Sequence, residues 1–157
     1  MGIVMASAGK YWQNVVRREQ EAELLFRGDQ YRRAIERYYN AKSGANKFPP
    51  NIDALLSDDR FPQARRHLRR LYKDPVTGED FGLITAQTAS GAAALPASVR
   101  TTPGIIGVYS KSDKEPLKQT TFPDEYKDFE GKKRYSDWKF LYTAPQQAHG
   151  QISGTKP

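Results

Sequence analysis

The apolar positions of the first forty residues recur at helical spacing. Steps of three and four residues place them on one stripe of a helix. The stripe comprises Leu24, Tyr31, Ala34, Ile35, Tyr38 and Ala41. Strong helix formers fill this stretch, and no proline occurs before Pro49. The pattern therefore predicts one continuous helix from about Lys10 to Ala41, with Gly44 as its stop.

The same helix is apolar on several faces before Gly28. Its apolar residues there are Trp12, Val15, Val16, Ala22, Leu24, Leu25 and Phe26. A helix that packs on one domain needs a single apolar stripe, so we expect only the downstream half to pack on its own domain. The surface that another molecule would bury comprises Trp12, Val15, Val16, Leu25 and Phe26. The alternative is an ordinary solvated helix whose first turns fray.

Charged residues between the apolar positions support the helix. Glu23 precedes Arg27 by four residues, and Asp29 precedes Arg33 by the same spacing. An acid placed one turn before a base stabilises a helix by about 0.2–0.5 kcal/mol per pair. We predict both ion pairs.

Residues 48–78, which several prolines interrupt, are predicted to form two short helices and a turn. Asn51 is a good N-cap for a short helix that continues to Leu56. Pro62 suits the first turn of a second one, which would bury Leu68 and Leu71 and expose its arginines. The turn is predicted in Asp74-Pro75-Val76-Thr77-Gly78, because Asp bonds its own downstream backbone, Pro fixes φ and Gly accepts a positive φ.

Three later segments have the character of short strands. They are residues 81–85, 105–109 and 138–143, the last with Trp138, Phe140 and Tyr142 at alternate positions. Three such strands would form a small antiparallel sheet. The predicted fold class is α+β: a long N-terminal helix, two short helices, then a three-stranded antiparallel sheet.

The segments between and after the strands lack a periodic apolar pattern. Residues 86–103 are rich in small residues and are predicted to form a mobile loop, and residues 111–136 to form a polar excursion. A chain of 157 residues with 38% hydrophobic content can bury one modest core. We divide it into a short apolar start (1–9), one folded unit (10–144) and a disordered tail (145–157).

Charge and cysteine content narrow the possible chemistry. Lys and Arg outnumber Asp and Glu by 25 to 18, which gives a formal charge of +7. This charge permits nucleic acid or an anionic membrane as a partner without requiring either. The absence of Cys excludes a disulfide framework, thiolate metal ligands and cysteine nucleophiles.

One basic run is the strongest candidate for a nucleic-acid surface. It reads ARRHLRRLYK and contains Arg65, Arg66, Arg69, Arg70 and Lys73 around His67. Clustered bases can neutralise phosphates. The sequence shows neither a helix-turn-helix pair nor strand aromatics set for base stacking. We therefore interpret the run as a solvated helix face and do not expect nucleic acid as a partner.

The sequence contains no recognisable catalytic constellation. The two histidines, His67 and His149, lie in no metal or nucleophile motif, and no Gly-rich phosphate loop follows a strand. The paired carboxylates Asp58-Asp59 and Glu79-Asp80 are at predicted turns, where acids are common for backbone reasons. We expect no enzymatic activity and assign no catalytic, cofactor-binding or metal-binding residue.

The order of these elements resembles that of type II secretion pseudopilins, of the type IV pilin-like superfamily. The likeness comprises a long N-terminal helix, a short helix after FPPNIDALL, the junction RRLYKDPVTGEDF, and strands around GIIGVYSKS and YSDWKFLYT. It covers roughly residues 10–144. Its most specific parts are the junction from Leu71 to Gly78 and the pairing of GVYSKSDKEPLK with SDWKFLY.

The resemblance implies a structural subunit of a periplasmic pseudopilus, assembled by helix packing, that helps to export folded proteins. Its partners would be other pseudopilin subunits and the secretion machinery. The family has a leader peptide and a long apolar helix, and a membrane span needs about 20 apolar residues. Gly2 to Gly9 is too short for a span or a signal peptide. We expect the chain to start near the end of the membrane helix, with its head in the periplasm and its anchor in the bacterial inner membrane.

The resemblance also raises a question of calcium. Major pseudopilins bind Ca²⁺ through oxygen ligands in a C-terminal loop. The corresponding excursion offers the carboxylates of Asp113, Glu115, Asp124, Glu125, Asp128 and Asp137, without a recognisable ligand spacing. We expect no cofactor, with calcium as the alternative.

Two other functions remain open. One is a type IV or DNA-uptake pilin, and the other is a small basic nucleic-acid-binding domain, which salt-sensitive DNA binding would favour. In a filament, the basic run would instead meet acidic neighbours such as Glu19, Glu21 or Glu23.

Overall fold

The computed structural model describes residues 3–41, 46–86 and 104–144. Its elements, in chain order, are α1 (Ile3–Asn40), α2 (Asp53–Leu56), β1 (Gly82–Thr85), β2 (Ile105–Tyr109), the 3₁₀ helices η2 (Asp124–Phe129) and η3 (Tyr135–Asp137), and β3 (Lys139–Leu141). The predicted α+β fold class is confirmed. Some of the predictions fall on residues outside the described ranges. They are the helix stop at Gly44, the loop over residues 87–103, and the tail from 145, which contains His149.

The sheet is antiparallel in the order β1-β2-β3. Val108 occupies the middle strand, with Leu83 of β1 on one side and Phe140 of β3 on the other. All three predicted strands are confirmed in place, each as long as or shorter than its prediction. Trp138 and Phe140 are 0% exposed and Lys139 between them is exposed, which confirms the predicted alternation as far as Phe140, whereas Leu141 and Tyr142 are both half-buried.

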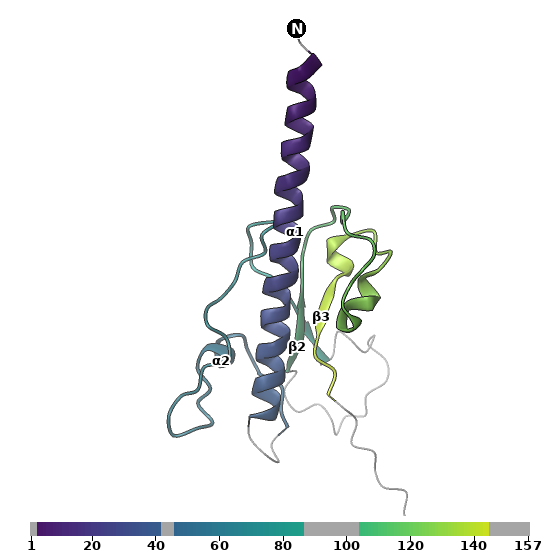
Figure 1. The fold of residues 1–157 in the computed structure, drawn as a ribbon. Coiled ribbons are helices and arrows are strands. Elements are labelled where there is room, and N and C mark those ends of the chain that lie inside the picture. Colours follow the sequence, from purple (N-terminus) through teal and green to yellow (C-terminus); the bar gives the residue numbers. More distant parts are fainter. Residues whose placement is uncertain (1–2, 42–45, 87–103, 145–157) are drawn as a thin grey trace, which may run out of the picture.

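The long helix lies across β2 and β3 and buries one stripe against them (Figure 1). The predicted stripe is confirmed from Leu24 to Tyr38. At Gly28 the helix packs closely on β3, because a Cβ there would lie 2.4 Å from the Phe140 ring. Packing begins upstream of Gly28, at the buried Glu21, so more of the helix belongs to the head than the sequence predicted.

The stretch predicted to form a second short helix after Pro62 is not helical. It runs as an irregular segment in which Arg65 forms an isolated antiparallel bridge with Asp58. The backbone N–H groups of His67 and Leu68 both donate to the Leu55 carbonyl, at 2.9 and 2.8 Å. These bonds to a distant carbonyl replace the local bonds of a helix. Leu68 is buried as predicted, whereas Leu71 is exposed.

The turn predicted in this region is confirmed, and the predicted cap lies one residue from the observed one. Ile52 is the N-cap of α2 and makes no side-chain cap bond, while Asn51 Oδ1 accepts the Ala54 N–H at 2.9 Å from the preceding position. Asp74 Oδ1 accepts the Val76 N–H at 2.8 Å, and Gly78 has φ of +75°. Asp74 is also fully buried and accepts the Ser110 hydroxyl at 2.5 Å, so the turn is tied to the end of β2.

The polar excursion between β2 and β3 is part of the core. Although residues 111–136 are rich in charge, Phe122, Tyr126, Phe129 and Tyr135 are all buried. The Phe129 ring stacks on Trp138 with centroids 5.4 Å apart and an interplanar angle of 5°. The excursion is polar as predicted, since its charged side chains are largely exposed, but the sequence did not predict that its aromatic side chains complete the core. Irregular spacing hides these aromatic anchors in the sequence.

Candidate assembly surface

The N-terminal half of α1 extends beyond the rest of the described chain (Figure 1). Residues 8–14 are exposed, and the side chains of Tyr11 and Trp12 are 74% and 68% exposed. Two adjacent aromatic residues in water are costly, since burying each would contribute about 1.5–3 kcal/mol. Tyr11 and Trp12 therefore form an exposed aromatic pair on a part of the helix that the head does not cover.

The five residues predicted to form the surface divide into three groups. Trp12 and Phe26 are exposed, while Val15 and Val16 are half-buried. Leu25 packs partly against the chain's own core, so it belongs to the head as well. The Phe26 ring makes an edge contact with Tyr72, with centroids 6.4 Å apart. Tyr11, which the prediction omitted, is the most exposed large apolar side chain among the described residues.

Among the described residues, no helix is both long enough and apolar enough to cross a membrane.

A buried carboxylate fixes the point where the helix leaves the head. Glu21 is 5% exposed, and its two oxygens accept the backbone N–H groups of Leu117 and Lys118 at 2.8 and 2.9 Å. The Tyr135 hydroxyl donates to the same carboxylate at 2.8 Å. Burial and this hydrogen bond to Glu21 raise the pKa of Tyr135 to about 12, so the phenol remains a donor. Glu21 thus joins α1 to both ends of the excursion.

A basic residue reinforces the same junction. The Arg17 guanidinium donates to the Glu115 carbonyl at 2.9 Å, one turn before Glu21. An open hollow of about 460 Å³ lies beside it, lined by Asn14, Arg18, Glu21, Leu117 and Lys118. The polar contacts hold the excursion against the base of the projecting helix.

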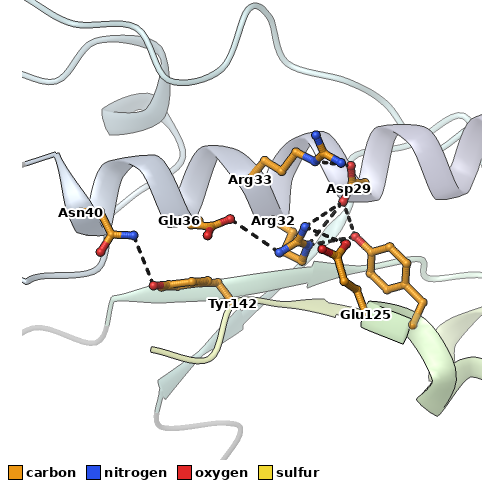
Figure 2. Close-up of polar contacts among 8 residues, drawn as sticks. Asp29, Arg32, Arg33, Glu36, Asn40, Glu125 and Tyr142 are labelled. Atoms are coloured by element: carbon orange, nitrogen blue, oxygen red, sulfur yellow. Dashed lines mark hydrogen bonds and ion pairs between the residues drawn. The ribbon is translucent and has the colours of Figure 1, made fainter. Parts of the chain in front are cut away.

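A second polar network joins α1 to η2 farther along the helix (Figure 2). Arg32 pairs with Asp29, Glu36 and Glu125 at 3.2, 3.6 and 3.0 Å. The Tyr126 hydroxyl donates to Asp29 and accepts from Arg32 Nε at 2.9 Å. Burial, together with the hydrogen bond to Asp29, raises the pKa of Tyr126. Arg32 bonds both Tyr126 and Glu125 of η2. These contacts hold η2 to the helix although the paired residues are 93 or more positions apart in the sequence.

Both predicted helix ion pairs are present. Arg27 Nε lies 2.8 Å from Glu23, and Arg33 Nε lies 2.6 Å from Asp29. Glu23 is therefore engaged within the chain, and Glu21 is buried. Of the three acids expected to meet the basic run of a neighbour, only Glu19 is exposed and makes no ion pair among the described residues.

A buried ionic cluster that no sequence motif indicated packs against the C-terminal half of α1. Asp58, 1% exposed, accepts two bonds from the Arg60 guanidinium, at 2.8 and 2.7 Å. His67 Nε2 lies 3.0 Å from the same carboxylate. Arg60 also donates to the Tyr38 carbonyl at 2.7 Å and lies over the Tyr38 ring. Asp58 is therefore a structural anchor and not the exposed turn residue that its sequence context predicted.

The Asp58 cluster makes stability depend on pH. The hydrogen bond from Arg60, aided by that from His67, lowers the pKa of Asp58 to about 2, against about 3.9 in an unfolded chain. A carboxyl with a lowered folded pKa contributes stability above its unfolded pKa and loses it as pH falls toward the folded value. We expect about 2 kcal/mol to be lost between pH 4 and pH 2.

The matched measurement compares urea unfolding of the wild type and Asp58→Asn from pH 7 down to pH 2. The difference in unfolding free energy should be constant above pH 5 and shrink below pH 4. A difference in unfolding free energy that does not change with pH would exclude Asp58 as the source of the stability lost at low pH.

The acidic residues considered for calcium lie apart or are engaged. Asp124 pairs with Lys127 at 2.6 Å, Glu125 with Arg32, and Asp113 accepts the Ser136 hydroxyl at 3.0 Å. Within the described ranges, no three His, Asp or Glu side chains come together in a group that could hold a metal ion.

Comparison of the chain with protein-family models, with curated proteins and with solved structures finds no match.

Proposed function

We propose that this chain is a structural subunit of a helix-packed filament, a pseudopilus of the type II secretion class, with the projecting half of α1 as its assembly surface. One observation carries the proposal: Tyr11 and Trp12 are the two most exposed large apolar side chains described, and both lie on the half-helix that the head leaves uncovered. The resemblance of residues 10–144 to pseudopilins supplies the class. In this setting the head would be periplasmic and the helix would continue into the inner membrane.

The physical basis is burial of helix surface by neighbouring copies. Apolar area that one copy cannot cover favours association by about 25 cal/mol per Å² removed from water. A helix pointing away from its head can reach the helices of several other copies, which is the geometry a filament centre requires. The polar junction at Glu21 keeps the helix at a fixed angle to the head, so that each copy presents the same surface.

The direct test replaces the exposed aromatic pair in the membrane-anchored protein within cells that carry the secretion machinery. The double variant Tyr11→Ser, Trp12→Ser should reduce filament yield and secretion by at least about tenfold, because two side chains lose about 1.5–3 kcal/mol of burial each. Its head should keep the thermal stability of the wild type, since both side chains are exposed.

The matched control is Leu83→Ser, which alters an exposed apolar side chain on the head, 46% exposed. It should leave filament yield unchanged. Normal filaments from the Tyr11, Trp12 variant would refute the proposal. Sequencing the reading frame upstream of the Met1 codon tests the class independently, because a pseudopilin gene must encode a leader and an apolar helix there.

A further inference from the structure

A run of exposed cations on one flank of α1 has no acidic partner within the described chain. Arg65, Arg66, Arg69, Arg70 and Lys73 are all exposed, and no ion pair among the described residues includes them. We call residues 65–73 the basic segment. Two of its guanidinium groups rest on aromatic rings, Arg65 on Phe61 at 4.2 Å and Arg70 on Tyr72 at 5.2 Å. This stacking orients the cations while leaving N–H donors free.

The basic segment is held in place although it is irregular. The Arg27 guanidinium donates to the Lys73 carbonyl at 2.7 Å, and Tyr31 donates to the Tyr72 carbonyl at 2.9 Å. Toward the other end, Arg37 donates to the His67 carbonyl, and the His67 side chain contacts the buried Asp58. A preorganised charged segment loses less conformational entropy on binding than a free loop would.

An exposed segment of opposite charge lies on the far side of the helix. Residues 124–130, the acidic segment, contain four carboxylates and one lysine, and all five of these side chains are exposed: Asp124, Glu125, Lys127, Asp128 and Glu130. No ion pair among the described residues includes Asp128 or Glu130. The buried rings of Tyr126 and Phe129 anchor this segment to the core.

The two segments cannot meet within one copy. Arg27 and Arg37 of α1 contact the basic segment, whereas Asp29 and Arg32 contact η2. At 3.6 residues per turn these pairs lie on opposite faces of the helix. Figure 1 agrees, with α2 and the chain after it on one side of α1 and η2 on the other. A contact between the segments therefore joins two copies through different surfaces.

We propose that the basic segment of one copy binds the acidic segment of a second copy. Such a head-to-tail contact uses two different surfaces and can repeat from copy to copy, and along a filament it builds a row of heads. The flanking charges are also opposite: Asp59 precedes the basic segment, and Lys132 and Lys133 follow the acidic one. An antiparallel alignment brings these opposite flanking charges to the same end of the contact. The inference takes its setting, a filament of identical subunits, from the proposed function.

The absence of cysteine in the chain allows a clean cross-linking test. Separately purified Arg69→Cys and Asp128→Cys chains are mixed under mild oxidation, and the heterodimer is quantified by mass spectrometry. We expect about tenfold more heterodimer than from Arg69→Cys with Lys139→Cys, a control cysteine at an exposed site on β3. In 1 M salt, where the screening length falls to about 3 Å, the yield should drop to the control level.

Charge reversal gives a second readout. Arg66→Glu added to the first chain should lower the yield to the control level, and Glu130→Arg added to the second chain should restore it, because the antiparallel alignment that opposes residues 69 and 128 also brings Arg66 close to Glu130. Equal yields for the test and control pairs would overturn the contact. So would binding of labelled duplex DNA through Arg69 and Arg70 without preferential cross-linking, which would assign the segment to nucleic acid.

The cross-link is independent of the helix surface. Tyr11→Ser, Trp12→Ser chains should still form it. If they do, yet that double variant assembles normally in cells, the proposed function fails and the contact stands. If the cross-link is absent while the aromatic pair proves essential for filaments, only the contact fails.

Discussion

Replacing Trp138 by alanine should lower the free energy of unfolding by about 3–5 kcal/mol, the range for large aromatic truncations in a core. Trp138 is 0% exposed and stacks on Phe129 with centroids 5.4 Å apart. The rings of Phe122 and Tyr135 meet it edge-on at 5.4 and 5.2 Å. Its loss opens a cavity between the sheet and the excursion, so both should unfold together. Urea unfolding followed by far-UV circular dichroism measures the change.

The chain supplies its own control, because it has two tryptophans. Trp12→Ala makes the same substitution at a side chain 68% exposed and should change the unfolding free energy by at most about 0.5 kcal/mol. Trp138→Phe should cost less than Trp138→Ala. It keeps a ring and removes an indole N–H that has no hydrogen-bond partner among the described residues. Equal losses for Trp12→Ala and Trp138→Ala would contradict this account of the core.

The features that the sequence predicts well are those set by local periodicity. The stripe from Leu24 to Tyr38 and the alternation of Trp138 and Phe140 report burial directly, since each element has one face toward the core. The turn at Asp74 is equally local, because its hydrogen bond reaches only to Val76. Such signals do not depend on where the rest of the chain lies.

The failures share a different physical cause. The segment after Pro62 contains helix formers at helical spacing, but the N–H groups of His67 and Leu68 bond the Leu55 carbonyl instead. This tertiary contact overrides local propensity. The carboxylates Glu21 and Asp58 look like surface acids in the sequence, although both are buried. The donors that satisfy Glu21 come from residues 96 to 114 positions away, which no local pattern shows. Asp58 is bonded by the nearby Arg60 and His67, but Arg60 also bonds the Tyr38 carbonyl of the long helix, a contact that no local pattern predicts.

The assembly surface was only partly predicted, because its extent also depends on contacts between residues far apart in the sequence. Excess apolar residues before Gly28 indicated a surface that one head cannot cover, and Trp12 and Phe26 are indeed exposed. Periodicity could not tell that Leu25 packs on the core. That distinction depends on how far the head extends along the helix, which the excursion and its contact with Glu21 determine.

Glu21→Ala should lower the unfolding free energy by about 3 kcal/mol. The substitution leaves three donors without their shared carboxylate: the N–H groups of Leu117 and Lys118 and the Tyr135 hydroxyl. Hydrogen bonds to a charged group contribute about 1.5–3 kcal/mol each, and an unsatisfied buried donor costs about 1–3 kcal/mol. The sum is reduced because Leu117 and Lys118 are near the surface and water can reach their N–H groups.

Hydrogen exchange locates the effect of this substitution. In Glu21→Ala, the amides of Leu117 and Lys118 should lose protection before the amides of β2 do, because they lose their acceptor directly. Glu23→Ala removes a helix carboxylate whose side chain is 43% exposed and paired with Arg27, and should cost only about 0.5 kcal/mol. If the two variants were equally stable, Glu21 would not hold the excursion to the helix. The projecting surface would then lack the fixed angle to the head on which a regular assembly depends.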